Sequence, residues 1–254
     1  MFIQNKYELI EKIGNGSFSN VYKAKHYMKD NYVAIKFDHD EQSKILIQNE
    51  INIYLSLLKK GSISFVNIKS FGIIDKRNYI IMDYISCNLA EYISKNRETC
   101  RTIDPVGLLK QIIGVVKKLH DCGYVHRDLK PDNLLVRENE IYLIDLGFST
   151  KLSDKVYDKM IGSVLFASYN THASKYQYRK KDDIISCFYI VLHLFCKKTL
   201  PWSNIVINGE NDNTKEMLYH LKKYTDFGRY YKDNIIERIL EYLKIYNICK
   251  SGTS

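Results

Sequence analysis

The sequence predicts an α+β fold in which a β-rich first part is followed by a mostly helical second part. Short runs rich in β-branched and aromatic residues, separated by turn residues, occupy residues 7–38 and 67–84. Between them, residues 42–60 carry apolar side chains at mostly helical spacing. After residue 105 the long apolar-periodic stretches are helical. We expect a hinge near residues 82–86, where the pattern changes.

Each element of the first part has its own signal. Strands are predicted at residues 7–14, 19–27 and 31–38, and a strand pair around the turn DKRN at residues 68–74 and 79–84. The helix over 42–60 is predicted because apolar residues recur there at mostly helical spacing: Ile45, Ile47, Ile51, Tyr54, Leu55 and Leu58. The first part should therefore be a sheet with one main helix.

The second part is predicted to contain a helix at 108–120, a hairpin at 134–145 and an amphipathic closing helix at 234–250. Its most apolar stretch is IISCFYIVLHLFC, residues 184–196. This run is well short of the roughly 20 residues that a membrane-spanning helix needs, so it is predicted to be a buried helix.

Composition narrows the class of protein. The formal net charge of +9 favours acidic partners such as phosphorylated protein, although a surface rich in lysine has the same effect. No aromatic–basic stacking motif supports nucleic-acid binding. Six cysteines without a C-x-x-C pair indicate reduced thiols and not a disulfide frame or zinc site. With no apolar leader visible, we expect an intracellular protein of the cytoplasm or nucleus.

Two features of the first part are suited to phosphate binding. Gly14 and Gly16 lie between two predicted strands, where glycine lets backbone N–H groups approach a phosphate. Taken alone, this pattern is equally typical of a hairpin turn. Lys36 ends an apolar strand and would alone indicate a surface lysine. With Glu50 on the following helix, however, a buried Lys–Glu pair would hold a polyphosphate in place.

The stretch HRDLKPDN carries the second set of candidates. Asp128 can accept a proton from an attacking hydroxyl, and Lys130 can neutralise charge on a transferring phosphoryl group. Asn133, and Asp145 after the next apolar strand, offer oxygen atoms of the kind that Mg²⁺ prefers. Four residues with matched roles in this order make a purely structural loop a poor explanation.

Together GNGSFSNVY, VAIK, the helical Glu50, HRDLKPDN and DLG resemble the eukaryotic protein kinases, from Ile13 to at least Trp202. The resemblance implies the bilobal protein-kinase fold, with an antiparallel five-stranded N-lobe, one main helix and a mostly helical C-lobe. It implies one kinase domain over residues 1–254: an N-lobe to about residue 82, a hinge at 83–86 and a C-lobe from about residue 87. ATP and Mg²⁺ would be the cofactors, and a monomer is expected.

The resemblance also implies roles for individual residues. Asp128 would be the catalytic base and Lys130 the γ-phosphate contact; Lys36, positioned by Glu50, would bind the α- and β-phosphates; Asn133 and Asp145 would hold Mg²⁺. The residues expected around the nucleotide are Ile13, Gly14, Asn15, Gly16, Ser17, Val21, Ala34, Lys36, Met82, Asp83, Ile85 and Leu135. Met82 would be the gatekeeper and residues 83–85 the adenine hinge. Asp183 would anchor the catalytic loop, and Ser163 would bond near Asp128 and Lys130.

The segment after the catalytic loop is similar to the casein kinase I group. GSVLFASYNTHASK stands where most kinases have Ala-Pro-Glu, with Ser168-Tyr169-Asn170 at the group's Ser-Ile-Asn, and KKDDIIS and LPW follow. The resemblance implies a serine/threonine kinase that favours acidic or already phosphorylated sites and needs no activation-loop phosphorylation. Arg179, Lys180 and Lys181 would bind the phosphate of such a substrate, although a solvated run of charges has the same pattern.

The chain departs from the kinase pattern at several positions. Ser19 replaces the third glycine of the phosphate loop, where its side chain can point outward. Leu146 replaces the usual Phe and can pack beneath the helix that carries Glu50. Phe188 replaces a usual Gly, so the local packing must differ. The segment after Trp202 is short, which predicts a compact C-lobe.

Two other functions stay open at this point. A pseudokinase scaffold is suggested by Ser19 and the short tail, but the retained Asp128 and Asp145 argue against it. A kinase of small molecules would share the fold, but the SYN segment, where casein kinases shape the peptide site, argues against that reading.

Overall fold

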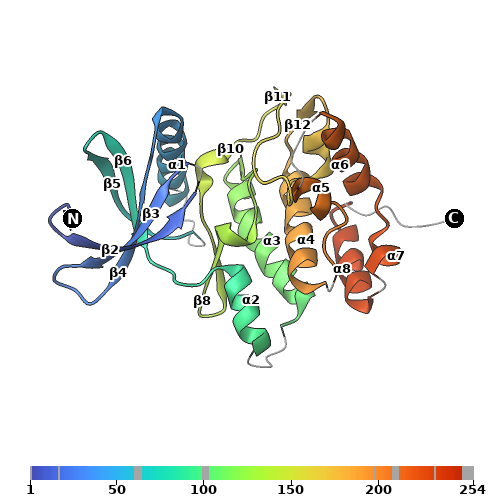
Figure 1. Ribbon diagram of the computed structural model, residues 1–254, viewed down its shortest axis with the longest axis horizontal. Coiled ribbons are helices and arrows are strands. Elements are labelled where there is room, and N and C mark those ends of the chain that lie inside the picture. Colours follow the sequence, from blue (N-terminus) through green and yellow to red (C-terminus); the bar gives the residue numbers. More distant parts are fainter. Residues whose placement is uncertain are drawn as a thin grey trace. The chain divides into compact units, whose positions relative to one another are not determined.

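The computed structural model describes residues 2–16, 18–59, 65–98, 103–196, 198–207, 212–231 and 233–247 (Figure 1). Its contacts divide the chain into two units. Unit 1 comprises residues 1–87 and 135–149, and unit 2 comprises residues 88–134 and 150–254. The first segment of unit 1 ends next to the hinge expected at 83–86. Residues 135–149 form the second segment of unit 1.

Unit 1 is built on an antiparallel sheet with the strand order β1-β2-β3-β4-β6-β5. Its strands are β1 (Phe2–Ile3), β2 (Tyr7–Asn15), β3 (Asn20–His26), β4 (Tyr32–Phe37), β5 (Ile68–Ile74) and β6 (Arg77–Asp83). The five predicted strands are confirmed, but the sheet has six strands because β1 pairs with β2 at its edge. The predicted helix is α1 (Glu41–Lys59).

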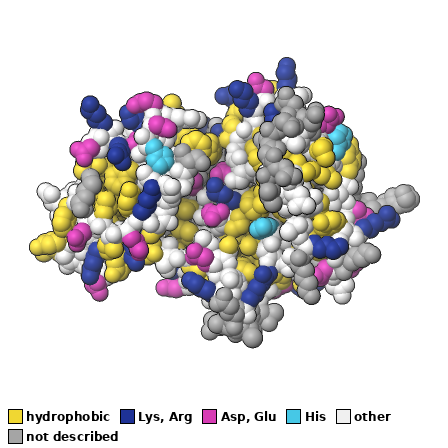
Figure 2. Space-filling view, in the orientation of Figure 1, with side chains coloured by type: hydrophobic (Ala, Val, Ile, Leu, Met, Phe, Trp, Pro, Cys, Tyr) yellow, Lys and Arg dark blue, Asp and Glu magenta, His cyan; other side chains and the backbone are white. Residues whose placement is uncertain are grey.

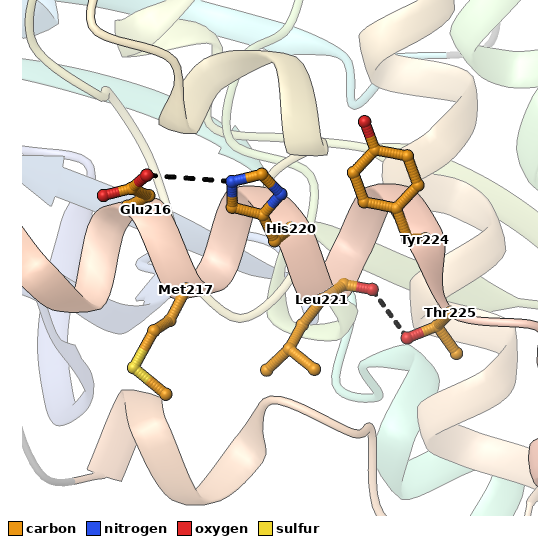
Figure 3. A pocket seen from close by; sticks show the side chains of 6 residues that line it. All are labelled: Glu216, Met217, His220, Leu221, Tyr224 and Thr225. Carbon is orange, nitrogen blue, oxygen red and sulfur yellow. Dashed lines mark hydrogen bonds and ion pairs between the residues drawn. The ribbon is translucent and has the colours of Figure 1, made fainter.

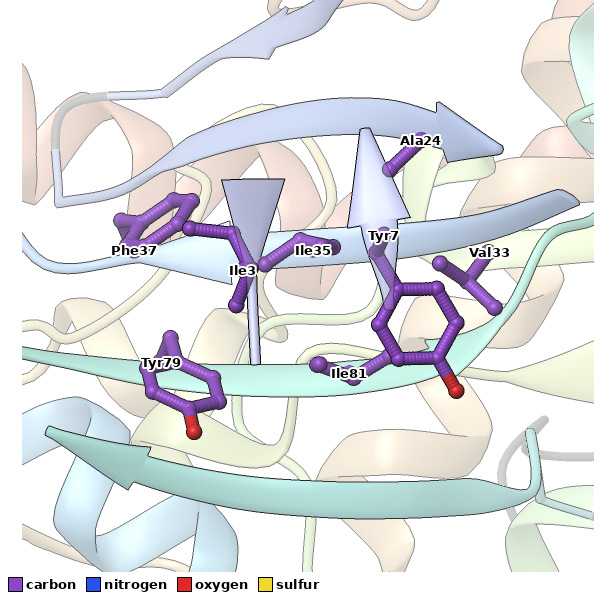
Figure 4. Packing of buried hydrophobic residues seen from close by; sticks show 8 residues of the cluster. All are labelled: Ile3, Tyr7, Ala24, Val33, Ile35, Phe37, Tyr79 and Ile81. Atoms are coloured by element: carbon purple, nitrogen blue, oxygen red, sulfur yellow. The ribbon is translucent and has the colours of Figure 1, made fainter. Parts of the chain in front are cut away.

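The two faces of the sheet carry two apolar clusters, because successive strand residues point to opposite faces. Val33, Ile35 and Phe37 of β4 face one cluster, shown in Figure 4 with residues of β1, β2, β3 and β6. Ala34 faces the other cluster, which contains Ile47 and Ile51 of α1 together with buried residues of β6. Lys36 lies two residues beyond Ala34, so strand alternation turns it towards the α1 side.

The segment that returns to unit 1 is a hairpin followed by a single turn. β8 (Leu134–Arg137) pairs with β9 (Glu140–Leu143), and a short 3₁₀ helix, η2 (Leu146–Phe148), follows. The two loop residues Glu138 and Asn139 have positive φ, as a tight two-residue hairpin loop requires. Leu135, Tyr142 and Ile144 pack against the α1-side cluster, which explains why this segment belongs to unit 1.

Unit 2 is mostly helical, as predicted. Its helices are α2 (Leu89–Glu98), α3 (Pro105–Asp121), α4 (Lys180–Phe195), α5 (Ser203–Ile207), α6 (Asp212–Tyr224), α7 (Phe227–Tyr231) and α8 (Asn234–Lys244). Its short strand pairs are β7 (Tyr124–Val125) with β10 (Thr150–Lys151) and β11 (Val156–Tyr157) with β12 (Tyr176–Gln177); its 3₁₀ helices are η1 (Pro131–Asn133) and η3 (Tyr169–His172).

Helix α4 forms the core of unit 2. Residues 182–192 are all buried, and α3 packs against this helix. Phe188, at the position where a glycine is usual in kinases, packs edge-on against Phe227 of α7 with the ring centroids 5.0 Å apart. The expected difference in local packing is therefore an aromatic contact between α4 and α7.

Among the described residues, the surface charges and the cysteines show no feature that marks a functional site. In Figure 2, basic and acidic side chains are interspersed over the face shown, so the excess positive charge does not gather into one patch there. Cys187 and Cys196 are free thiols, while Cys100 and Cys249 lie outside the described residues. Within the described ranges, no helix combines the length and apolar character needed to cross a bilayer.

Candidate active site

Lys36 is the centre of a buried charge cluster in unit 1. Its Nζ lies 2.7 Å from Oε2 of Glu50 and 2.7 Å from Oδ1 of Asp145. Lys36 and Glu50 are almost wholly buried, while the Asp145 side chain is about one third exposed. The structure thus brings together three of the residues predicted from separate motifs.

The electrostatics of this cluster follow from burial and from charge pairing. Burial lowers the pKa of Lys36, but the charges of Asp145 and Glu50 outweigh it, so the pKa is raised and the lysine stays protonated. Burial raises the pKa of Glu50, and Lys36 only partly offsets that effect. The protonated Lys36 is the group of this cluster that can attract the oxygens of a polyphosphate.

Helix α1 is tied directly to the segment that follows Asp145. The N–H of Leu146 donates to Oε1 of Glu50 at 3.3 Å, and Leu146 itself is fully buried. Nδ2 of Asn49 donates to the carbonyls of Gly147 and Ser149 at 2.8 and 2.9 Å. Two adjacent residues of α1 therefore hold residues 146–149, which fixes Glu50 relative to Asp145.

The apolar residues expected around the nucleotide lie together. Ala34, Met82 and Ile85 are buried in the α1-side cluster, and Val21 and Leu135 pack against it. Asp83 is half-buried: its carboxylate pairs with Lys69 at 2.6 Å and its N–H donates to the carbonyl of Asn67. This set could hold an apolar, planar group such as a base.

The predicted phosphate loop is the β2–β3 connection. Ile13 and Asn15 are exposed at the end of β2, and Gly16 donates its N–H to the carbonyl of Ser19 at 3.0 Å. A Cβ on Gly14 would lie 3.3 Å from Cβ of Val21, so glycine allows this close approach. Ser17 lies outside the described residues.

A histidine that the sequence analysis did not single out also holds this loop. Nε2 of His39, between β4 and α1, lies 2.9 Å from the carbonyl of Gly16, and Nδ1 lies 3.1 Å from Nδ2 of Asn20. A carbonyl can only accept, so Nε2 carries the hydrogen and Nδ1 accepts from the Asn20 amide.

In unit 2, the carboxylate of Asp128 is buried and held from both sides. Oδ1 accepts from the backbone N–H of Ser163 at 2.7 Å and from its hydroxyl at 2.6 Å, as expected for Ser163. Oδ2 lies 3.3 Å from Nζ of Lys130. Asn133 donates its amide N–H to the carbonyl of Asp128 at 2.9 Å. The four residues form one fixed group.

Asp183 of α4 anchors this loop, as the resemblance implied. Oδ2 accepts from His126 N–H at 2.9 Å and bonds to Nε2 of His120 at 2.7 Å. Oδ1 accepts from Arg127 N–H at 3.1 Å and from the Tyr178 hydroxyl at 2.9 Å. Burial would raise the pKa of Asp183, but the hydrogen bond and charge of His120, helped by His126, hold it below its usual value.

The preceding residue, Asp182, holds the SYN segment. Its carboxylate accepts from the hydroxyl of Ser168 and from Nδ2 of Asn170, the latter at 3.2 Å, and it caps α4 through the Arg179 N–H at 2.7 Å. Burial raises the pKa of Asp182, and these hydrogen bonds oppose that effect. Two consecutive aspartates of α4 therefore hold residues 126–127 and the SYN segment.

Aromatic contacts hold the segment around residues 157–159, which lies between Asp128 and the SYN segment in the sequence. The guanidinium of Arg127 lies 5.2 Å from the ring centroid of Tyr157, which stacks on Tyr176 at 5.7 Å. The Tyr176 hydroxyl donates to the carbonyl of Lys159 at 2.9 Å. Arg127 also has a positive φ of 73°, a conformation that is costly unless its surroundings impose it.

The predicted basic cluster is divided in the structure. Lys180 and Lys181 line a pocket of about 210 Å³ together with Lys117 and His120, whereas Nη2 of Arg179 donates to Gln177 at 2.7 Å. Lys181 also donates to the backbone carbonyl of Asn247. The pocket therefore joins the two lysines and not all three basic residues.

Two larger pockets lie along α6. One, of about 770 Å³, is lined by Glu216, Met217, His220, Leu221, Tyr224 and Thr225, and Figure 3 shows Met217 and Leu221 pointing to the same side of the helix. The other, of about 630 Å³, lies between α6 and the η3 region and includes Thr171 and His172. Neither is lined by Asp128, Lys130 or Asn133.

Asn133 of unit 2 and Asp145 of unit 1 each offer an oxygen of the kind that magnesium prefers. The amide nitrogen of Asn133 is committed to the Asp128 carbonyl, so its amide oxygen is the ligand atom that it can offer. Asp145 supplies a partly exposed carboxylate. Among the described residues no three acidic, His or Cys side chains form a metal cluster. Mg²⁺ commonly takes one or two protein oxygens when phosphates supply others.

Sequence reasoning missed Asn49, His120 and Asp182. Asp182 stands next to a predicted residue, and His120 ends the buried face of α3, so adjacency and helical spacing were available signals. Asn49 gave none, because its partners lie about a hundred residues away.

A comparison with known families completes these observations. Residues 7–245 match the family model described as Protein kinase domain. This span contains the Lys36 cluster of unit 1 and the group around Asp128 in unit 2.

Proposed function

Because the chain belongs to the protein kinase family, we propose that it is a serine/threonine kinase of the casein kinase I type. Its reaction would transfer the γ-phosphoryl group of ATP to acidic or already phosphorylated protein sites. One observation carries the proposal: the buried Asp128 carboxylate has one oxygen fixed by Ser163 and the other 3.3 Å from Lys130. A carboxylate held in this way can receive a hydroxyl proton beside a cation.

In this proposal, unit 1 binds the nucleotide. Val21, Ala34, Met82, Ile85 and Leu135 would surround the adenine, since they share one apolar cluster. The N–H groups around Gly14 and Gly16 would approach the phosphates, and Lys36 would neutralise the α- and β-phosphate oxygens.

Unit 2 acts on the protein substrate. Asp128 would orient the hydroxyl and accept its proton, while Lys130 would stabilise charge on the transferring phosphoryl group. Asn133 and Asp145 would hold Mg²⁺, which when bound shields the phosphate charges. The work of the protein is positioning and charge stabilisation, which dominate phosphoryl transfer.

The assignment to the casein kinase I type rests on the SYN segment. Ser168 and Asn170 both bind the buried Asp182, which gives the first and third residues of this segment a structural reason. Serine/threonine specificity is inferred from the same resemblance. A preference for acidic or phosphorylated sites is supported by Lys180 and Lys181, which line one pocket with Lys117, more directly than by Arg179.

The test is transfer of labelled phosphate from Mg-ATP to casein and to a pair of acidic peptides, one phosphorylated beforehand and one not. We expect label on Ser or Thr with the wild type and none above background with Asp128→Asn, which keeps the size but not the charge. A preference for the phosphorylated peptide that Lys180→Gln/Lys181→Gln removes, and Lys223→Gln leaves intact, would support the anion site.

Other outcomes separate the rival functions. ATP binding without transfer above the mutant's background would favour a scaffold, and transfer only to small molecules would favour a small-molecule kinase. Either result would overturn the proposed function.

A further inference from the structure

Lys222 of α6 is a buried cation that belongs to none of the charge clusters described above. Its relative exposure is 2%. Nζ donates to the backbone carbonyls of Val164 and Ala167, each at 2.6 Å, and lies 3.0 Å from Nε2 of His172. A buried ammonium is costly unless its hydrogens are bonded. Here three hydrogens meet three acceptor atoms, so the site is built to hold this lysine.

The state of His172 agrees with this arrangement. Burial, and then the charge of Lys222, lower the pKa of His172 to about 3. The imidazole is therefore neutral near pH 7, and Nε2 can accept a hydrogen bond from the ammonium. The rings of Tyr189 and Trp202 lie 5.6 and 5.2 Å from Nζ and add a favourable cation–π environment.

The lysine holds one continuous stretch of chain, residues 163–172, which we call the substrate segment. Ser163 begins it and bonds to Asp128. The indole N–H of Trp202 donates to the carbonyl of Leu165 at 2.8 Å, beside the two carbonyls that Lys222 binds. Asp182 of α4 binds the segment further along, at Ser168 and Asn170. The segment is thus held from α4 on one side and from α6 on another.

We propose that Lys222 is a positioning residue that fixes the substrate segment for the protein substrate. This inference rests on the proposed function, in which Asp128 receives the hydroxyl proton. Because Ser163 is bonded to that carboxylate, the chain flanking the reacting hydroxyl must pass close to the residues that follow Ser163. Lys222 touches neither ATP nor the reacting atoms in this scheme. It acts through the backbone of residues 164–167.

The contacts explain why a lysine serves here. One ammonium can donate to three acceptors that converge on a single point, which a neutral amide with two N–H groups cannot do. Arginine would place a larger planar group in a site enclosed by two aromatic rings. Loss of the charge would leave two buried carbonyls without donors, and these would turn towards other partners and displace the segment.

The test compares Lys222→Met with Lys223→Met in the full chain. Lys223 is the adjacent lysine, but its Nζ bonds the Tyr219 hydroxyl at 2.7 Å at the surface, so it is a matched control. We expect Lys222→Met to raise the KM for a peptide substrate about tenfold or more, the equivalent of losing one hydrogen bond to a charged group. The KM for ATP should change less than about twofold, and Lys223→Met should match the wild type.

A second readout is independent of activity. Hydrogen exchange should become faster at the amides of residues 163–172 in Lys222→Met, and remain unchanged at those of unit 1. Lys222→Arg, which keeps the charge and donors, should restore part of the peptide affinity. If Lys222→Met does not fold, Trp202→Phe replaces it: it removes the N–H bond to Leu165 and shrinks one of the two rings beside Lys222, and it should raise the peptide KM selectively, by a smaller factor.

Equal rises in both KM values, or an unchanged peptide KM with unchanged exchange at residues 163–172, would overturn the inference. The proposed function can fail separately. If the wild type phosphorylates no protein or peptide, that function is lost, and hydrogen exchange still decides whether Lys222 fixes this segment.

Discussion

Asp183→Asn tests how the loop that leads into Asp128 is held. Each oxygen of the Asp183 carboxylate accepts one backbone N–H, from His126 on one side and Arg127 on the other. A hydroxyl or an imidazole can reverse its role, but a backbone N–H cannot. Whichever way the new amide is turned, its NH₂ group therefore meets a backbone N–H, and that buried donor loses its acceptor.

The magnitude follows from these contacts. A hydrogen bond to a charged group contributes about 1.5–3 kcal/mol, and a buried donor left unpaired costs about 1–3 kcal/mol. We therefore expect the free energy of unfolding to fall by about 3 kcal/mol. For a chain of this size that lowers Tm by about 6–12 °C. If the same free energy is lost because the loop shifts and Asp128 is misplaced, kcat falls by about a hundredfold.

The assay is calorimetric unfolding at pH 7 beside Tyr178→Phe, which removes only the hydroxyl bond to Asp183 and should cost about 1 kcal/mol. Because the two variants should lower the Tm by different amounts, Tyr178→Phe controls for a general loss of stability caused by any change in this region. A Tm for Asp183→Asn within 2 °C of the wild type, or equal to that of Tyr178→Phe, would refute the reasoning.

The Tm difference between wild type and Asp183→Asn should depend on pH in a defined direction. The pKa of Asp183 is lower in the folded protein than in the unfolded chain, because the bonds from His120 and His126 outweigh burial. Its stabilisation is then fully present above the unfolded pKa of about 3.9 and is lost as the pH falls through the folded value. The Tm gap between wild type and Asp183→Asn should be constant from pH 7 to about 5 and shrink below about 4.

Three further predictions concern other elements. Gly162→Ala should lower the urea midpoint of unfolding, because φ at this position is +95° and the new Cβ would lie 2.3 Å from the Arg127 carbonyl oxygen. Gly114→Ala should raise the urea midpoint, because the space around Gly114 is open and alanine favours a helix. Midpoints that both rise or both fall would contradict this prediction. Asn49→Leu should speed hydrogen exchange at residues 145–149 about tenfold by removing two hydrogen bonds, and unchanged exchange there would count against it. Cys187 is fully buried and burial raises its pKa, so a maleimide at pH 8 should label it only on unfolding; labelling of the native chain would show that α4 opens.

Most helices and strands could be predicted from local sequence patterns. The features that were missed depend on contacts between distant segments or on very short elements. The long strands and helices were found because their apolar spacing is a property of neighbouring residues. β1 was missed because two residues are too few for a period. Nothing local in residues 135–149 indicates which distant apolar cluster this hairpin packs on.

The same division applies to the candidate site. Lys36, Glu50 and Asp145 were found because each stands in a recognisable motif, and the structure brings them within hydrogen-bonding distance. Lys222 stands in none. Its partners Val164 and Ala167 are more than fifty residues away, and an amphipathic helix rich in lysine gives no sign that one lysine is buried.

The adjacency of Asp182 and Asp183 has a consequence for how the chain tolerates change. The two carboxylates are neighbours on one helix, so covalent geometry sets the distance between the parts of the chain that they hold. A shift of α4 as a rigid body would carry the catalytic loop and the substrate segment together and preserve their spacing. An inserted residue between the two aspartates would rotate one carboxylate by about 100° around the helix axis. The length of α4 at this one point is therefore fixed by the two parts of the chain that its aspartates hold.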